Sequence, residues 1–135
     1  MAEPIFYVDH SDIREGRIAE VRAGMRELAA FVEEREPQLI AYHFYLDGAE
    51  STMTVVAVHP DAASLERHLE LGGPKFREFA ALIRMRSIDV YGQPSPAVLD
   101  RLRQKAEMLG DAGGAGVTVH TLQAGFSRRF GEAAL

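Results

Sequence analysis

The order of the predicted elements indicates an α+β fold of the ferredoxin-like type, an antiparallel sheet with helices on one face. Apolar runs of strand length alternate with amphipathic helical segments in the order strand, helix, strand, strand, helix, strand. The two central strand segments are apolar on both faces, and the chain has no cysteine with which disulfides could supplement packing. With 135 residues and 47% hydrophobic content, the chain is expected to build one continuous core.

The first strand is predicted over residues 4–8 and the first helix over residues 14–36. The strand segment, PIFYV, is apolar and aromatic, and the polar residues 9–12 that follow it favour a turn or a helix cap. In the helical segment, apolar residues recur at steps of three and four. Asp12 with Glu15 three places on resembles a capping box, and a proline directly after the segment predicts the end of the helix.

The second and third strands are predicted over residues 39–46 and 52–59, joined by a polar hairpin. One face of the second strand carries Ile40, Tyr42, Phe44 and Leu46, and the other carries Leu39, Ala41, His43 and Tyr45. A sheet with one solvated face would instead alternate apolar with polar residues. We therefore expect a second copy of the chain to cover the helix-free face, giving a homodimer with a barrel-like core, a dimeric α+β barrel.

The second helix is predicted to begin after Asp61, a residue that favours the N-cap position. It is expected to stop at residues 72–74, where two glycines precede a proline. Residues 76–83 are expected to add one or two helical turns, and residues 85–91 predict the fourth strand. In the ferredoxin-like arrangement the strand order is 4-1-3-2, which places the second and fourth strands at opposite edges.

The end of the chain predicts an extension of this unit. Residues 1–92 are expected to form the ferredoxin-like domain, and residues 93–135 a helix and strand that extend the same domain. Ser95 can cap this helix, and the proline that follows it suits the first turn. Residues 117–122 predict a fifth strand, at a sheet edge or across to a partner copy. From residue 130 onward we expect a frayed tail.

Composition argues against several classes of partner and ligand. The formal net charge of −5 disfavours nucleic acid, whose binding depends on clustered Lys and Arg. No apolar run approaches the roughly 18 residues of a membrane-spanning helix, and no signal-peptide pattern opens the chain, so we expect no membrane association and a cytoplasmic location. The five histidines lack the spacing of metal ligands. We expect no metal and no cofactor.

Several polar and aromatic side chains are candidates for a ligand pocket. His43 and Tyr45 lie two apart on one face of the second strand and could line a cavity, which Tyr7 of the first strand could join. Asp89 on the fourth strand is expected to face the same interior if its aliphatic neighbours meet the helices. The second and fourth strands lie about 14 Å apart, so His43 and Asp89 cannot hydrogen-bond directly. The alternative is that these groups are satisfied contacts at a dimer interface.

Residues 56–79, VAVHPDAASLERHLELGGPKFREF, resemble the antibiotic biosynthesis monooxygenase (ABM) family of dimeric α+β barrels. In that family a helix with a leucine and histidine signature follows the third strand, and a short break follows the helix. Leu65, His68 and Leu69 occupy the helix signature here, and residues 74–76 occupy the break. By the order of elements the resemblance covers about residues 4–92.

The resemblance implies cofactor-independent oxygenation of quinol-like or polyketide aromatics, as in some members, or haem degradation, as in others. This chain departs from the family at two points. Lys75 stands where quinol-oxygenase-like members often have histidine. The sequence also contains neither tryptophan nor asparagine, so the Asn–Trp site that several catalytic members use is not present.

The resemblance leaves one candidate site, in which His68 transfers protons because an imidazole pKa near 6.5 suits acid–base work on a phenol. The candidate substrate-binding residues around it are Tyr7, His43, Tyr45, Asp89, Phe76 and Phe79, the last two forming the roof of an apolar pocket. The competing interpretation makes His68 a structural residue of the helix.

Three hypotheses on function follow from the sequence. The first is a small dimeric ABM-like protein that binds an apolar or aromatic small molecule and acts as a cofactor-independent monooxygenase. The second is a non-catalytic ligand-binding or interaction module that keeps the fold. The third is a haem-binding or haem-degrading protein, in which His43 or His68 would be an axial ligand.

Overall fold

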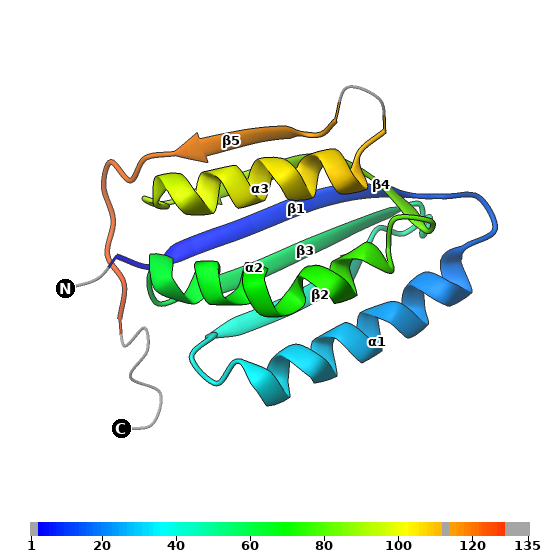
Figure 1. Cartoon of the computed structure of the whole chain (residues 1–135), viewed down its shortest axis with the longest axis horizontal. Coiled ribbons are helices and arrows are strands. Elements are labelled where there is room, and N and C mark those ends of the chain that lie inside the picture. Colours follow the sequence, from blue (N-terminus) through cyan, green and yellow to red (C-terminus); the bar gives the residue numbers. More distant parts are fainter. Residues whose placement is uncertain (1–2, 112–113, 129–135) are drawn as a thin grey trace.

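The computed structural model describes residues 3–111 and 114–128. The chain forms two βαβ-like halves, each a strand, a helix and a strand. A further helix and strand follow the second half (Figure 1). In chain order the elements are β1 (Ile5–Ile13), α1 (Ile18–Arg35), β2 (Ala41–Leu46), β3 (Thr52–His59), α2 (Ala62–Arg77), β4 (Ile83–Tyr91), α3 (Pro96–Leu109) and β5 (Gly116–His120).

The strands form one sheet in the order β2-β3-β1-β4-β5. The first four are antiparallel to their neighbours, and β5 pairs with β4 in parallel. Figure 1 shows α1, α2 and α3 side by side over one face of this sheet. The predicted ferredoxin-like α+β fold with a C-terminal helix and strand is confirmed, and within the chain the fifth strand extends a sheet edge.

The core lies between the sheet and the helices, because every second strand residue points toward the helices. In β1 these inward positions are Ile5, Tyr7, Asp9 and Ser11, and in β3 they are Met53, Val55, Ala57 and His59, all of them buried. Three of these eight side chains, Asp9, Ser11 and His59, are polar. The inner layer therefore contains hydrogen-bonding groups in a place where an apolar side chain would be the ordinary choice.

The prediction that the first strand ends at residue 8 is wrong, because β1 continues to Ile13. Residues 9–12 pair with β3 on one side and β4 on the other. Two flanking strands satisfy the backbone of this polar segment, and that outweighs the turn preference of its side chains. The same alternation that buries Tyr7 then buries Asp9 and Ser11.

The predicted capping box at Asp12 is also wrong. The first residue of α1 is Ile18, and Arg17 occupies the N-cap position without a side-chain cap. The carboxylate of Asp12 instead accepts a hydrogen bond from Arg84 at 2.9 Å. It also forms an ion pair with Arg86 at 2.7 Å. These contacts join the end of β1 to the start of β4.

The second helix begins as predicted but does not stop at residues 72–74. The Asp61 side chain accepts a hydrogen bond from the Ser64 backbone N–H at 2.9 Å, and the helix runs on to Arg77 with Pro74 inside it. A Cβ atom on Gly72 would lie 2.4 Å from Cζ of Phe76, so the glycine makes room for that ring. Proline removes one hydrogen bond of the helix at this point, which weakens the turn that carries Phe76.

The third helix begins where the sequence predicts, with the Ser95 hydroxyl accepting from the Val98 backbone N–H at 3.2 Å. The predicted frayed tail from residue 130 lies outside the described residues. Among the helices that the structure describes, none has both the length and the apolar character needed to cross a membrane.

Candidate functional site

A cavity of about 20 Å³ lies in the core between the sheet and all three helices. This volume has room for about one water molecule. Most of its lining is apolar or aromatic, and two charged side chains complete it. The lining residues are Leu28 from α1, Tyr42 and Phe44 from β2, Met53 and Val55 from β3, Phe76 near the end of α2, Phe79 in the turn after it, Ile83 and Met85 from β4, Lys105 and Leu109 from α3, and Asp9 from β1.

The two charged residues of the cavity are joined through a tyrosine. The hydroxyl of Tyr7 donates to Oδ2 of Asp9 at 2.6 Å and accepts from Nζ of Lys105 at 2.8 Å. The ammonium and the carboxylate oxygen are themselves 3.8 Å apart. All three side chains are buried, with Lys105 8% exposed, so this Lys–Tyr–Asp chain replaces water with internal partners.

Burial acts on the pKa of each of these groups in the direction of its neutral form. It raises the pKa of Asp9, an effect that the Lys105 charge opposes. It lowers the pKa of Lys105, opposed by the Asp9 charge. Burial and the adjacent Asp9 carboxylate together hold the pKa of Tyr7 well above its usual value. The tyrosine therefore stays protonated and serves as a hydrogen-bond bridge.

One oxygen of the Asp9 carboxylate lacks a hydrogen-bond partner. Oδ2 is held by Tyr7, whereas Oδ1 is buried with no partner among the described residues. A buried carboxylate oxygen without a donor is costly. Because Asp9 lines the cavity, that oxygen can be satisfied by a hydroxyl or N–H group of a molecule bound there.

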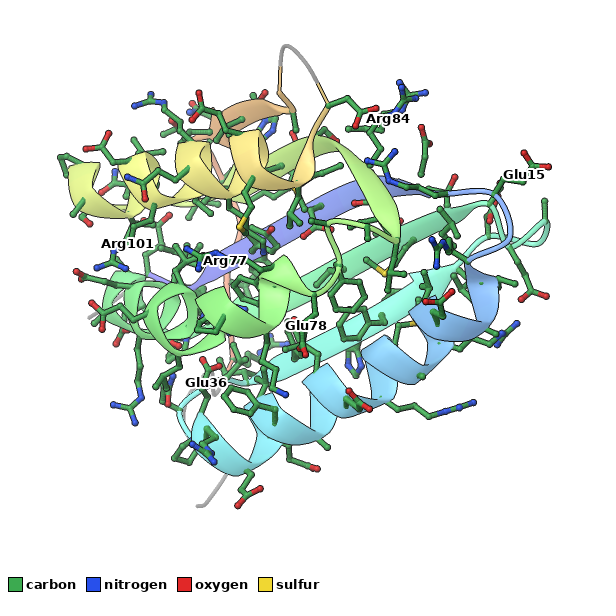
Figure 2. All side chains as sticks on the ribbon, turned by 45° about the vertical axis from the view of Figure 1, so that its right-hand side comes forward. Glu15, Glu36, Arg77, Glu78, Arg84 and Arg101 are labelled. Atoms are coloured by element: carbon green, nitrogen blue, oxygen red, sulfur yellow. The ribbon has the colours of Figure 1, made fainter. Side chains whose placement is uncertain are left out.

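A second buried polar group consists of His68 on α2 and Glu36, which directly follows α1 and is labelled in Figure 2. Nδ1 of the imidazole lies 2.9 and 3.0 Å from the two carboxylate oxygens. Burial lowers the pKa of His68, and the hydrogen bond and charge of Glu36 oppose that shift. With Nδ1–H donating to Glu36, Nε2 of the neutral ring is the proton-accepting nitrogen. It is buried, and no described residue partners it.

His59 adds a third buried group beside the second. Its Nδ1 lies 2.7 Å from Oγ of Ser64, and its ring centroid is 5.5 Å from that of His68. Burial, with the positive potential of His68 and Lys105 added, lowers the pKa of His59 to about 3. The ring is therefore neutral at physiological pH, and its Nε2 also lacks a partner in the described part of the chain.

The structure brings four of the sequence-predicted site residues to the interior. Phe76 and Phe79 line the cavity, and Tyr7 bridges two of its lining residues. His68 is buried beside the cavity and does not line it; its ring centroid lies 5.3 Å from that of Phe76 and 5.1 Å from that of Tyr42, two rings that do.

The other three predicted residues lie on the opposite, helix-free face of the sheet, so the expected common cavity is not formed. His43 and Tyr45 are exposed there, with ring centroids 6.1 Å apart. The carboxylate of Asp89 accepts a hydrogen bond from Nε2 of His120 at 2.9 Å. Ile88 and Val90 of the fourth strand do meet the helices, which is the condition under which Asp89 was expected to face the cavity. Alternation along the strand then places Asp89 on the far face, away from the cavity.

Sequence reasoning missed the three charged residues of the interior. The polar residues from Asp9 onward predict a turn, although Ile5, Tyr7 and Asp9 share the two-residue period of one strand face. Lys105 lies on the apolar side of α3, between Leu102 and Leu109. Its spacing from them was a usable signal, whereas nothing in the local pattern of Glu36 pointed to His68, which is 32 residues away.

Metal and haem chemistry find little support in the geometry of the described part of the chain. No group of three or more His, Cys, Asp or Glu side chains there is arranged to hold a metal ion. The interior cavity, at about 20 Å³, is far smaller than a porphyrin. His43, the other residue considered as an axial ligand, is exposed on the far face of the sheet.

Comparison with solved structures identifies proteins of the same fold. MupZ from Pseudomonas fluorescens superposes with a TM-score of 0.71 at 21% identity, covering 93% of this chain and 95% of MupZ. SnoaB, a cofactor-independent oxygenase from Streptomyces nogalater, gives a TM-score of 0.58 at 20% identity, covering 70% of this chain and 96% of SnoaB. A provisional antibiotic biosynthesis monooxygenase from Bacteroides thetaiotaomicron gives 0.56 at 13% identity, covering 65% and 85%.

These likenesses confirm the predicted ferredoxin-like α+β fold of the chain. Comparison of the sequence with models of known families finds no match, and comparison with curated proteins finds none either. At such identities a shared fold does not carry over a reaction. The reaction has to be argued from the side chains of this chain.

Proposed function

We propose that this chain binds a small aromatic molecule with a phenolic or enolic hydroxyl in the interior cavity and acts on it as a cofactor-independent monooxygenase. The observation that carries the proposal is that Asp9, whose Oδ1 has no partner among the described residues, lines a cavity whose wall is apolar or aromatic apart from Asp9 and Lys105. Aromatic side chains there suit an aromatic ring. A carboxylate oxygen among them suits one hydroxyl group and can accept its proton.

The proposed chemical step is the removal of that proton. Asp9 accepts the hydroxyl proton, and the raised pKa of its carboxyl group makes it a stronger base than an exposed aspartate. The oxyanion that forms is stabilised by the Lys105 ammonium, which lines the same cavity. The carbon activated by the phenolate or enolate, which bears one hydrogen, then gives its electron pair to O₂, the second substrate, and forms a C–O bond. The peroxide takes the proton back from Asp9 and loses water to leave a C=O group. The substrate thus supplies both electrons, and the second oxygen atom leaves as water.

His68 is the second proton-transfer group of the proposal. Glu36 holds its Nδ1 and leaves Nε2 as the accepting nitrogen, the arrangement in which a carboxylate orients an imidazole base. Its ring contacts Tyr42 and Phe76 of the cavity wall.

The small size of the cavity favours the non-catalytic alternative as the second candidate function. At about 20 Å³ the cavity does not admit an aromatic ring unless side chains of its wall move. Phe76 is the side chain best placed to move, because the helical turn that carries it follows Gly73 and Pro74. A wall that stays closed to aromatic molecules would leave an interaction module that keeps the fold.

Replacing Asp9 with Asn is expected to weaken the binding of 2-naphthol by about tenfold or more, because a charged hydrogen bond contributes roughly 1.5–3 kcal/mol. Oxygen uptake with 1,4-dihydroxynaphthalene, corrected for its spontaneous oxidation, should fall about 100-fold or more, the size of a general-base contribution. Fluorescence titration and an oxygen electrode measure the two effects. In the same assays, His68→Gln should lower the rate and leave 2-naphthol affinity unchanged.

The matched control for this experiment is Ser11→Ala. Ser11 lies two residues further along the same face of β1 and also has a buried, unpartnered side-chain oxygen, but it does not line the cavity. Its replacement should change neither binding nor oxygen uptake. Equal affinities of the Asp9→Asn variant and the unaltered protein for 2-naphthol would refute the assignment of Asp9 to the ligand.

We also propose that a second copy of the chain covers the helix-free face of the sheet. In register across this face, His43, Val56, Val8 and Asp89 lie in one row. Tyr45 is 53% exposed and Tyr91 42%, which is unusual for large rings on a sheet face. His43, Tyr45 and Asp89 then contact the partner, the alternative role that the sequence left open for them.

Light scattering tests this assembly. We expect a mass of about twice 14.9 kDa, and a monomer after Val56→Glu, which puts a charge into the middle of the face. The control is Ala30→Glu on the exposed side of α1, which should remain a dimer. A monomeric unaltered protein would contradict the proposal.

A further inference from the structure

The groove between α2 and α3 is continuous with the wall of the interior cavity. Figure 1 shows the two helices side by side and running in the same direction. The groove has a volume of about 450 Å³, and two of its lining residues, Lys105 and Phe76, also line the cavity. Nζ of Lys105 lies 4.0 Å from the centre of the Phe76 ring. This pair therefore separates the cavity from the groove.

Two other grooves touch the cavity wall, and their charges differ from those of the α2–α3 groove. The groove between α1 and α2 shares only Leu28 and Phe79 with the cavity, and its rim carries three glutamates, Glu20, Glu27 and Glu78, beside one lysine. The groove between α1 and β2 shares only Tyr42 with the cavity. Of these three grooves in the described part of the chain, the α2–α3 groove is the one that shares a charged residue with the cavity.

The rim of the α2–α3 groove is basic. Its charged residues are Arg77, Arg101, Lys105 and a single acid, Glu70. Arg101 is 3.3 Å from the carboxylate of Glu70, which neutralises that end of the groove. Figure 2 shows Arg77 and Arg101 where α2 and α3 adjoin.

Arg77 is the basic group of the groove that the protein leaves unpaired. No hydrogen bond or ion pair joins it to another described residue. It lies seven residues after Glu70, which is two helical turns, and therefore on the same side of α2. The pair formed by Glu70 and Arg101 fixes where the two helices lie level with each other. Because the helices run in the same direction, Arg77 lies near Met108, which is seven residues after Arg101. Met108 is about one turn beyond Lys105.

We propose that the α2–α3 groove is an anion subsite of the interior pocket. The substrate carries a carboxylate at the end of the molecule opposite the hydroxyl group that donates a hydrogen bond to Asp9. This carboxylate pairs with Arg77. The inference rests on the proposed function, since the groove has a role for a ligand only if the cavity holds the ring. It adds a substrate class, the hydroxylated aromatic acids, and it makes Arg77 a specificity-determining residue.

The test compares two probes that differ in one group. 2-Naphthol has the hydroxyl alone, and 6-hydroxy-2-naphthoic acid has a carboxylate at the far end of the same ring system. In the unaltered protein the acid should bind about fivefold more tightly, as a partly exposed ion pair allows. Raising the salt concentration should reduce this gain. The Met108 methyl signal, at the groove, should shift with the acid and not with naphthol.

The variant that decides the inference is Arg77→Gln, with Arg103→Gln as the matched control. Arg103 lies on α3 outside the groove and pairs with Asp100 at 3.6 Å. Arg77→Gln should abolish the fivefold gain and leave 2-naphthol affinity unchanged, whereas Arg103→Gln should keep the gain. Unfolding midpoints of both variants should match the unaltered protein.

The possible failures are distinguishable. If 2-naphthol binds with the expected dependence on Asp9 but the acid gains nothing, or gains equally after Arg77→Gln, the subsite is refuted and the proposed function stands. If neither probe binds, the proposed function fails and the subsite fails with it.

Discussion

Replacing Lys105 with Met is expected to lower the free energy of unfolding by about 3 kcal/mol or more. The substitution removes the positive partner of a buried carboxylate, and breaking one side of a buried ion pair typically costs about 3–5 kcal/mol. In this chain the ammonium is hydrogen-bonded to Tyr7 and lies 3.8 Å from Asp9. Urea unfolding at neutral pH measures the loss.

A double-mutant cycle separates this electrostatic effect from the loss of packing. Met fills much of the volume of the lysine stem, and Asn in place of Asp9 removes the charge that the lysine balances. The double variant Asp9→Asn, Lys105→Met should therefore be more stable than Lys105→Met alone. Gln104→Met, on an exposed position of α3, is the control and should stay within about 0.5 kcal/mol of the unaltered protein. Additive effects of the two substitutions would contradict the coupling.

Acid should destabilise the fold, with His59 making a defined contribution. Its pKa of about 3 in the folded chain lies below the value of about 6.5 that an unfolded histidine has. Between those values the unfolded state binds a proton that the folded state does not, so stability falls as the pH drops below 6.5. For one histidine the slope is about 1.4 kcal/mol per pH unit.

The variant His59→Gln isolates this contribution, because it removes the titrating group and leaves the remaining carboxylates and histidines in place. The lowered pKa of His68 also makes the fold less stable as the pH falls, whereas the raised pKa of Asp9 has the opposite effect. The measured slope of the unfolding free energy against pH is the sum of these contributions. We expect His59→Gln to flatten the dependence of the unfolding free energy on pH by about one proton. Gln104→Met, on an exposed position of α3, should leave the dependence unchanged, and equal slopes for all three proteins would refute the account of His59.

Local sequence signals predicted the elements of this fold well. Asp61 and Ser95 cap α2 and α3 as expected, because an N-cap depends only on the next three residues. The order of strands and helices also followed from periodicity alone. These features belong to short segments, in which the side chains and the backbone they satisfy are neighbours in the chain.

The site was harder to predict because its partners are far apart in the sequence. Lys105 reaches Tyr7 across 98 residues, and His68 reaches Glu36 across 32. Turn preference suggested that β1 stopped before Asp9, and only pairing with two neighbouring strands overrides that preference. His43 and Tyr45 were grouped with His68 by residue type, but the two faces of the sheet separate them.

The most direct test of the central claim is the methionine methyl NMR spectrum of the protein during titration with 2-naphthol. Met53 and Met85 line the cavity, whereas Met25 lies on α1 outside it. We predict shifts of the Met53 and Met85 signals and nuclear Overhauser effects from both methyls to the naphthol ring, with Met25 unchanged. Binding without any effect at Met53 and Met85, or no binding at all, would contradict the claim that this cavity is the ligand site.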